Sequence, residues 1–482
     1  MTFNERLKIL KKQNKDKEAI SLLTNEIKKN PNNTHLYYQR CKLYFKNNFY
    51  KQANGDIRIA IELSPFKWIY HYKSACLYRT TRQHTLAMKE INKALEIFKK
   101  TMTKIGDLQT NKNICKIYHI RGSILYDTEN FKKAKMDFKK AFQLDQNNPK
   151  VIYGFAQSLR KCSDFLNATK YYNKVYELEK GNYLSTFYRG ICFYKLHHFD
   201  KAIDSYKQTV EINPQYTFAW LNLINCLTKI GNFKEALHHS ERLRELGFAK
   251  GSNYPSDEVS RCYFSLGQYK KAITNINNHL KYSPNSFSCN YMKVEILMKQ
   301  LLFADAAKIC KRLKNKYPNN NHFKVLYLRG LCNMYNGKLK EAQNELYFLV
   351  QKQPKNPEYI NSLHECSREL PNFKSNSKIK VNLNNAKQYI KEKTPIHLKL
   401  QISANIYMEN NQPQLARKEL QKLLIYIPNC QEFWVCYLLS KCFLLENNVW
   451  QSLNFCKKAI LLAPQCKLFK NHLNFLQNSI NN

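Results

Sequence analysis

Residues 183–216 read YLSTFYRGICFYKLHHFDKAIDSYKQTVEINPQY, and this stretch decides the fold. Apolar side chains recur every three or four residues on both sides of a short turn that ends at Phe199, which predicts two amphipathic helices. Gly190 lies where the first helix can approach another helix closely. Pro214 cannot continue a helix, so it ends the second one. The stretch therefore predicts a helix–turn–helix unit of 34 residues.

The same unit recurs along the chain. The residues equivalent to Ala202 mostly follow one another at intervals of 34 residues, with some intervals of 36, and most have a proline twelve residues later. A fixed period of this length is typical of a solenoid, in which each unit buries its apolar face against its neighbours. The equivalent positions are Ala19, Ala53, Ala87, Ala134, Ala168, Ala202, Ala236, Ala272, Ala306, Ala342, Ala416 and Ser452.

These units resemble the tetratricopeptide repeat family from about Asn4 to Pro464, which is nearly the whole chain. Several positions match together, and two units illustrate the match. The resemblance implies an all-α solenoid of about twelve helix–turn–helix repeats, wound into a right-handed superhelix with a concave groove and closed by a C-terminal capping helix. The matching residues are Trp220, Leu223, Gly231, Phe233 and Ala236 in one unit, and Tyr118, Gly122, Phe131, Ala134, Phe138 and Ala141 in the other.

The regularity of the repeats divides the chain into four segments. Residues 1–356 are predicted to form a regular array of ten repeats, with a helical insertion near residues 98–114. Residues 357–395 are predicted to form a degenerate repeat, because much of this segment lacks a helical apolar period. Residues 396–465 hold two further repeats, and residues 466–482 form the capping helix. The degenerate repeat carries a basic, irregular loop with Lys374, Lys378 and Lys380.

The net charge is the unusual number in the composition. The 482 residues include 78 Lys and Arg against 36 Asp and Glu, which gives a formal charge of +42. A balance this basic indicates an anionic partner such as nucleic acid, an acidic protein surface or an anionic membrane face. The chain is also rich in Asn, Lys, Tyr and Ile, a bias that A/T-rich coding can produce. Compositional drift is therefore the alternative explanation of the charge.

The 16 cysteines do not form the framework of a disulfide-rich protein, and no Cys-x-x-Cys motif is present. The family places a small buried residue at the tenth position of each repeat, and several cysteines stand there. Free buried thiols favour a reducing intracellular compartment, either the cytoplasm or alternatively a cilium, the cytoskeleton or the nucleus. The cysteines at the tenth position are Cys192, Cys226, Cys262, Cys332 and Cys442.

The first residues do not read as a targeting segment. They lack the apolar core of a secretory signal and carry Glu5, Asp16 and Glu18, which a mitochondrial presequence usually avoids. No apolar run approaches the ~20 residues that a membrane span needs. We therefore expect a protein that is neither secreted nor inserted in a membrane.

No catalytic constellation is visible. The sequence has no Gly-rich phosphate loop and no His-Glu-x-x-His motif. The neighbouring histidines His197 and His198, and His238 and His239, would point in different directions on a helix and would not converge on a metal. Only about residues 370–395 lie outside the repeats, which is too short for a catalytic domain. The prediction is a non-enzymatic protein without a cofactor or metal.

The groove implied by the family is the candidate binding surface. Positions 2, 5, 9, 12 and 13 of each first helix face inward in the family; position 5 is mostly aromatic here, including Tyr437, and position 13 is often Lys. Rings and lysine stems can contact an extended chain while ammonium groups meet carboxylates or phosphates. The candidate residues are Tyr38, Lys42, Lys46, Tyr72, Tyr153, Arg160, Lys161, Phe187, Lys195, Lys229, Arg261, Tyr291, Lys299 and Tyr327.

The alternative is that these aromatic and lysine side chains only pack against neighbouring helices of the chain. Lysine is common at position 13 in the family, and aromatic rings often fill gaps between neighbouring helices. A specialised version of the family grips the C-terminal carboxylates of chaperones with Lys and Asn at positions 5 and 9 of successive first helices. The mostly aromatic position 5 does not support that role here.

Three functions fit these observations. The first is a non-enzymatic scaffold in a larger assembly, which holds an acidic peptide, helix or tail of a partner protein in the groove. The second is an RNA- or ribonucleoprotein-binding repeat protein that uses Lys–phosphate contacts and aromatic stacking. Against it, Lys greatly outnumbers Arg, and no repeat shows a paired-residue base code. The third is a regulatory array whose enzyme lies on another chain.

Overall fold

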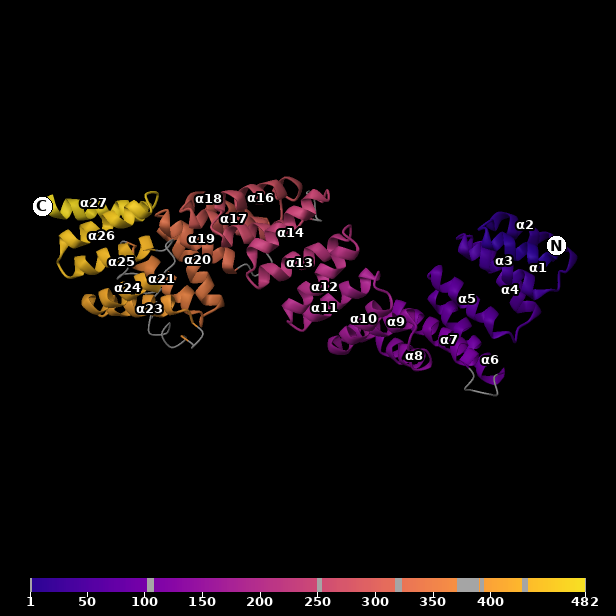
Figure 1. Cartoon of the computed structure of the whole chain (residues 1–482). Helices are drawn as coiled ribbons and strands as arrows, with labels where there is room; N and C mark the ends of the chain where they lie inside the picture. Colours follow the sequence, from indigo (N-terminus) through magenta and orange to yellow (C-terminus); the bar gives the residue numbers. More distant parts are fainter. Residues whose placement is uncertain are drawn as a thin grey trace. The chain divides into compact units, whose positions relative to one another are not determined.

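The computed structural model describes residues 2–101, 108–248, 254–316, 323–370, 390, 394–426 and 432–481. These residues form 26 helices and, within the same ranges, no strand. The helices divide into two compact units, Met1–Asn232 and Phe233–Asn482. In each unit, helices that follow one another along the chain pack together, as Figure 1 shows. The all-α solenoid of helix pairs is confirmed.

The N-terminal unit contains six helix pairs and one further helix. Each helix packs against the one before it and the one after it. The first helices of the repeats are α1 (Phe3–Lys12), α3 (Thr34–Lys46), α5 (Trp68–Thr80), α7 (Leu108–Asp127), α9 (Pro149–Lys161), α11 (Tyr183–Lys195) and α13 (Thr217–Lys229). The second helices are α2 (Asp16–Lys29), α4 (Tyr50–Leu63), α6 (His84–Thr101), α8 (Phe131–Leu144), α10 (Phe165–Leu178) and α12 (Phe199–Ile212).

The C-terminal unit begins with α14 (Phe233–Glu245), which is a second helix. Its pairs are α15 (Ser256–Ser265) with α16 (Tyr269–Tyr282), α17 (Phe287–Lys299) with α18 (Phe303–Lys316), α19 (Phe323–Tyr335) with α20 (Leu339–Lys352), α23 (Ile396–Glu409) with α24 (Pro413–Tyr426), and α25 (Glu432–Leu445) with α26 (Val449–Leu462). The helix α21 (Pro357–Arg368) precedes α23, and α27 (Lys467–Asn481) ends the unit.

The repeated small residues form the contact between the two helices of a pair. All twelve residues equivalent to Ala202 have no exposed surface. The stretch 183–216 folds as predicted, into α11 and α12. Gly190 of α11 faces the ring of Tyr206 on α12, where an added Cβ would lie 2.6 Å from a ring carbon. The cysteines at the tenth position are likewise buried, which confirms their interpretation as small core side chains.

The turn inside most pairs uses a residue with a positive φ. Gly231, Gly267 and Gly337 adopt φ values between 72° and 82°. Equivalent turns instead use side-chain-bearing residues such as Asn48 and His197, at φ 61° and 60°. Asparagine tolerates this left-handed conformation better than most residues. The turn is therefore specified by its position in the repeat and not by glycine alone.

Near residues 98–114, the helices are longer than their counterparts. The helix α6 spans 18 residues and α7 spans 20, against 13 or 14 residues in most other repeats. The basic loop with Lys374, Lys378 and Lys380 lies outside the described residues.

The last repeats of the C-terminal unit pack on residues far away in sequence. The ring of Phe433 on α25 lies 6.1 Å from Phe303 and 5.6 Å from Tyr335, and α27 also contacts α19. Tyr437 has no exposed surface and donates a hydrogen bond to Glu369 at 2.6 Å. The expectation that position 5 faces an open groove is therefore wrong for Tyr437, because aromatic side chains of the chain itself fill that side of α25.

Candidate ligand-binding surface

Three half-buried lysines lie within electrostatic reach of one another on successive first helices. Lys11, Lys42 and Lys73 come from α1, α3 and α5, and we call them the lysine row. Burial lowers the pKa of each one. The charge of Lys42 lowers the pKa of Lys11 further, and that of Lys73 does the same to Lys42. The folded chain thus holds three ammonium groups where each is less favourable than in water.

Aromatic rings lie beneath two of these ammonium groups. Lys42 Nζ is 4.8 Å from the ring centroid of Tyr38, and Lys73 Nζ is 3.6 Å from that of Phe45. Cation–π contacts of this kind partly offset burial of the charge. Among the described residues, neither Lys42 nor Lys73 makes an ion pair with a carboxylate. The rings therefore support the lysines while their charge stays unneutralised within the described chain.

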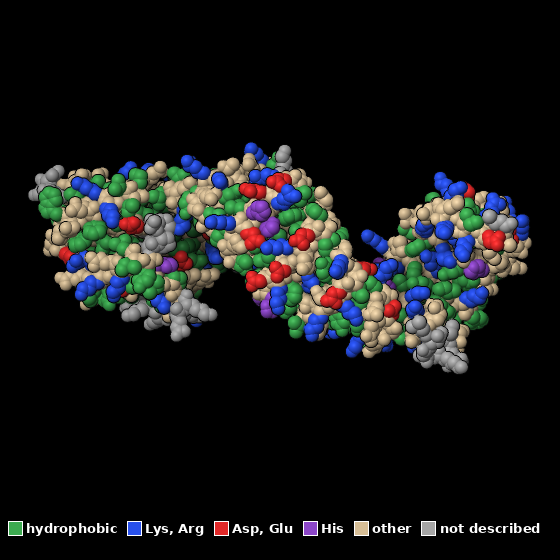
Figure 2. Space-filling model, viewed as in Figure 1, with side chains coloured by type: hydrophobic (Ala, Val, Ile, Leu, Met, Phe, Trp, Pro, Cys, Tyr) green, Lys and Arg blue, Asp and Glu red, His purple; other side chains and the backbone are tan. Residues whose placement is uncertain are grey.

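A cavity of about 480 Å³ adjoins the row between α1 and α3. Lys11 lines it and donates a hydrogen bond to Gln39 Oε1 at 2.7 Å. His35 also lines it, and burial followed by the charges of Lys42 and Lys11 lowers the pKa of this imidazole. In Figure 2, Lys and Arg side chains gather on the visible face of the N-terminal unit near α3 and α5. Glu26 is the one carboxylate that lines this cavity.

One further predicted residue of this unit lines a second cavity, and another contacts its wall. Tyr153 lines a space of about 570 Å³ together with His119, Lys150 and Tyr188. The guanidinium of Arg160 lies 4.6 Å from the centroid of Tyr188. Burial lowers the pKa of His119 to about 4, so this histidine is neutral at pH 7. Neutral, aromatic and charged side chains line the second cavity, whereas cationic side chains dominate the surface around the lysine row.

Other predicted residues of the N-terminal unit contact their own chain. Lys46 pairs with Asp16 at 2.9 Å, and Lys229 donates to the hydroxyl of Tyr194 at 2.5 Å. Phe187 is 6% exposed and packs on Tyr206 and Tyr216. These contacts agree with the packing alternative. The rest of the set here is Tyr72, which is half-buried, Lys161, whose Nζ lies 5.1 Å from the ring of Phe131, and Lys195, which is exposed.

Three predicted groove residues of the C-terminal unit line one cavity. Arg261, Tyr291 and Tyr327 line a space of about 860 Å³ between α15, α17, α19 and α21. Two carboxylates, Glu295 and Glu358, line it as well, and burial raises the pKa of both. This cavity is therefore of mixed charge, unlike the lysine row. Lys299 lies one turn beyond Glu295 on α17.

Sequence reasoning missed several residues of these sites, and four charged ones show why. Lys11, Glu295 and Glu358 stand at positions 12, 9 and 2 of their repeats, which are inward-facing in the family. These repeat positions could have indicated the three residues, but the prediction used mainly positions 5 and 13. Lys73 stands at position 6, outside the inward set, and only the packing of α3 against α4 and α5 brings it to Lys42.

Two kinds of site are absent from the described part of the chain. No group of three or more His, Cys, Asp or Glu side chains in those residues is placed to hold a metal ion. No helix that the structure describes is both long enough and apolar enough to cross a membrane.

The comparison with known families agrees with the helix pairs. The family model described as "Tetratricopeptide repeat" matches residues 70–101 and 116–148, which cover most of α5 and α6 and much of α7 and α8. The same helix pair recurs through both units. The chain contains tetratricopeptide repeats.

Curated relatives of the chain include Hsp70-Hsp90 organizing proteins. Hsp70-Hsp90 organizing protein 1 of Glycine max is 24% identical over 253 residues, which cover 50% of this chain and 40% of the relative. Hsp70-Hsp90 organizing protein 3 of Arabidopsis thaliana is 24% identical over 49% of this chain and 43% of its own length. The chain thus aligns with less than half of the length of these relatives.

Solved structures that align with the chain do so at low sequence identity. The structure of the APC/C hetero-tetramer Cut9-Hcn1 aligns over 98% of this chain and 95% of that one, with 12% identity and a TM-score of 0.41. The structure of YrrB, a TPR protein with an unusual peptide-binding site, aligns over 41% of this chain and 95% of its own, with 18% identity and a TM-score of 0.34.

Proposed function

We propose that this tetratricopeptide repeat protein is a non-enzymatic scaffold for protein–protein interaction, and that its lysine row holds an acidic segment of the partner. The observation that carries the proposal is the set of three half-buried ammonium groups, in which neighbours along the row repel each other and Lys42 and Lys73 rest on aromatic rings. A carboxylate placed among them would relieve that repulsion. The curated relatives are named as organizing proteins of two other proteins, which supports a protein as the partner.

The energetic gain from such a partner is substantial. A hydrogen bond to a charged group contributes about 1.5–3 kcal/mol. Lysine stems and the rings of Tyr38 and Phe45 add apolar contact along the same surface. An extended segment with several Asp or Glu residues would make these contacts at successive repeats.

The test is a titration of the full-length protein against a fluorescein-labelled, Glu-rich peptide of twelve residues, followed by anisotropy. We expect saturable binding that weakens at least tenfold in the double variant K42E/K73E. The control is K51E/K132E, which changes the net charge equally at exposed lysines of α4 and α8. Equal weakening by both variants would show attraction by net charge alone and would overturn the proposal.

RNA is the second candidate partner, and the lysines beside rings favour it together with the charge of +42. Lysines would then contact phosphates while rings stack on bases. A filter-binding titration with single-stranded RNA at two salt concentrations separates the two ligands. Absence of RNA binding at the lower salt concentration would eliminate this candidate.

A further inference from the structure

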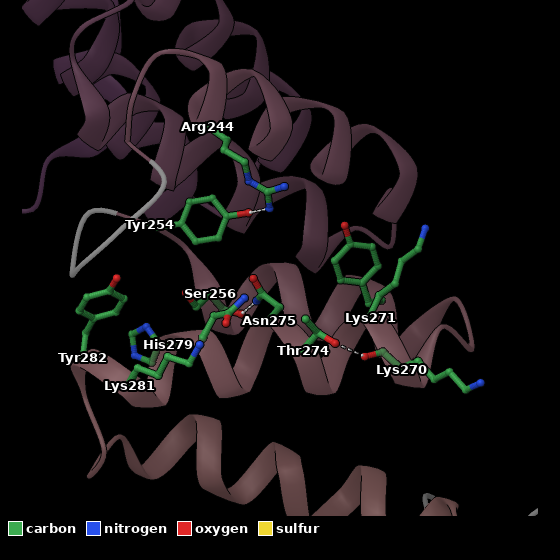
Figure 3. A pocket seen from close by; sticks show the side chains of 12 residues that line it. Arg244, Tyr254, Ser256, Lys270, Lys271, Thr274, Asn275, His279, Lys281 and Tyr282 are labelled. Carbon is green, nitrogen blue, oxygen red and sulfur yellow. Dashed lines mark hydrogen bonds between the residues drawn. The ribbon is translucent and has the colours of Figure 1, made fainter.

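A second cationic cavity lies in the C-terminal unit, between α14 and α16. It has a volume of about 550 Å³, and no Asp or Glu is among the residues that line it. Figure 3 shows Arg244 and Tyr254 facing side chains of α16, among them Asn275 and His279. The basic residues that line the cavity are Arg244, Lys270, Lys271, His279 and Lys281.

Hydrogen bonds hold the polar walls of this cavity in place. Arg244 Nη2 donates to the hydroxyl oxygen of Tyr254 at 2.9 Å, which leaves the Tyr254 O–H as a donor and the guanidinium with further N–H groups. Tyr254 and Ser256 are both buried. Asn275 Nδ2 donates to Ser256 O at 3.0 Å and to the Ser260 hydroxyl at 2.8 Å. Arg244 and Asn275 are thus held in place before any ligand arrives, whereas the lysines that line the cavity are exposed.

The lysines of the cavity stand at both ends of α16. Lys270 and Lys271 are in its first turn and Lys281 is in its last, so their backbones are separated by roughly 16 Å at 1.5 Å per residue. Within the described residues, these three lysines make no ion pair. Glu241 on α14 acts on the pKa values of Arg244 and Tyr263 but does not line the cavity. The positive charge of these lysines is therefore divided between the two ends of α16.

We propose that this cavity binds a small ligand that carries two or more phosphate groups. Its volume falls in the range of about 300–1,000 Å³ that is usual for small-ligand sites. A phosphate offers three or more acceptor oxygens, which match the clustered donors of Arg244, Tyr254 and the lysines better than one carboxylate does. Separate cations at the two ends of α16 require at least two anionic groups, and Tyr263 and Tyr282 would contact the skeleton between them.

The test is isothermal titration calorimetry of the full-length protein with sodium tripolyphosphate. We expect one saturable site, at which inorganic phosphate binds at least tenfold more weakly than tripolyphosphate. The variants R244A and K271E/K281E should each weaken tripolyphosphate binding at least tenfold. The control K311E/K340E alters exposed lysines of α18 and α20 by the same charge as the double variant and should bind as the wild type does. Circular dichroism melting checks that all variants fold.

The lysine row provides the second control. K42E/K73E should keep tripolyphosphate binding while it loses the Glu-rich peptide, so the two proposals can fail separately. Loss of tripolyphosphate binding in K42E/K73E or in K311E/K340E, or no saturable binding to the wild type, would overturn the cavity assignment. Vesicles with and without phosphatidylinositol bisphosphate identify the source: binding as tight as that of the free headgroup indicates a lipid, and weaker binding indicates a soluble compound.

Discussion

Small side chains determine how closely the helices of a pair approach. Gly190 and Gly154 both lie in first helices where a Cβ would be 2.6 Å or less from an aromatic ring of the adjacent second helix. Real Cβ atoms do not approach other atoms this closely, so Tyr206 or Phe138 would have to move. Since both rings are buried, any movement disturbs neighbouring contacts as well.

The variant Gly190→Ala should destabilise the N-terminal unit by roughly 1–3 kcal/mol, because the added methyl group overpacks the contact with Tyr206. Chemical denaturation measures this difference. The matched control is Gly55→Ala in α4, where no atom lies within 4 Å of the added Cβ. That change should be neutral or stabilise by up to about 1 kcal/mol through helix propensity. Equal stability of the two variants would contradict the assigned contact.

The lowered pKa values of single lysines also predict that binding depends on pH. The pKa values of Lys11, Lys42 and Lys73 lie below the ordinary 10.5, so these groups lose their protons at a lower pH than exposed lysines do. An acidic ligand needs the protonated form, and affinity should therefore fall as pH rises toward 10.5. Anisotropy titrations with the Glu-rich peptide between pH 7 and pH 10 measure this. If the affinity of K42E/K73E depends on pH in the same way as that of the wild type, the titrating groups lie elsewhere in the protein.

At the scale of elements, one buried carboxylate connects three helices of the C-terminal unit. Glu365 of α21 is 2% exposed and accepts hydrogen bonds from Gln401, Asn405 and Trp434. These bonds join α21, α23 and α25 around one buried carboxylate. A buried charge with this many partners requires the three helices to keep one arrangement.

The helix α27 should become less stable in acid because of His472. This residue is buried beside the Ser440 hydroxyl at 3.2 Å, and burial followed by the charge of Lys441 lowers its pKa to about 3. Below pH 6.5 the unfolded state takes up a proton that the folded state refuses, so stability falls as pH drops from 6.5 toward 3. At pH 5 the loss is roughly 2 kcal/mol.

Hydrogen exchange of α25–α27 at pH 7 and pH 5, corrected for intrinsic rates, measures this loss. The variant His472→Gln should show a smaller difference between the two pH values, while α9 and α10 serve as an internal reference. An identical acid sensitivity in wild type and variant would assign the effect to other groups.

For the whole molecule, the charge of +42 is distributed over two compact units, in which 78 Lys and Arg outnumber 36 Asp and Glu. Some of the 36 acidic residues pair internally, as Asp56 does with Arg40 and Asp137 with Arg121, both at 2.7 Å. Internal pairing of this kind leaves a surplus of lysine at the surface. A surplus of one sign accelerates encounter with an oppositely charged partner and makes binding sensitive to salt.

The affinity for the Glu-rich peptide should therefore fall at least tenfold between 50 mM and 300 mM NaCl, since screening shortens the reach of exposed charges. The slope should be shallower in K42E/K73E, because fewer cations contact the peptide. A peptide with Gln in place of Glu should bind weakly at both salt concentrations. Binding that is independent of salt would contradict an electrostatic partner site.

The right-handed superhelix, the boundaries of the four segments and the ligand groove stay predictions. The helix pairs and their buried small residues could be predicted because they depend on contacts within about 34 residues, which the repeat period displays directly. Contacts of this kind repeat at Ala134, Ala168 and Ala202 and are therefore visible many times over. The short range of these contacts explains why residue order alone indicated them.

The binding surfaces were decided by tertiary structure. Lys11, Lys42 and Lys73 belong to three different repeats, and the burial that lowers their pKa values exists only after those repeats pack. Tyr437 is covered because its ring packs on Phe469 of α27, with 4.8 Å between the centroids, and its hydroxyl meets Glu369, 68 positions earlier in the chain. Sequence by itself determined the repeating helix pair, because its apolar spacing is local. Only the folded chain decided which charges are brought together, because electrostatic neighbours depend on distance in space and not on distance along the chain.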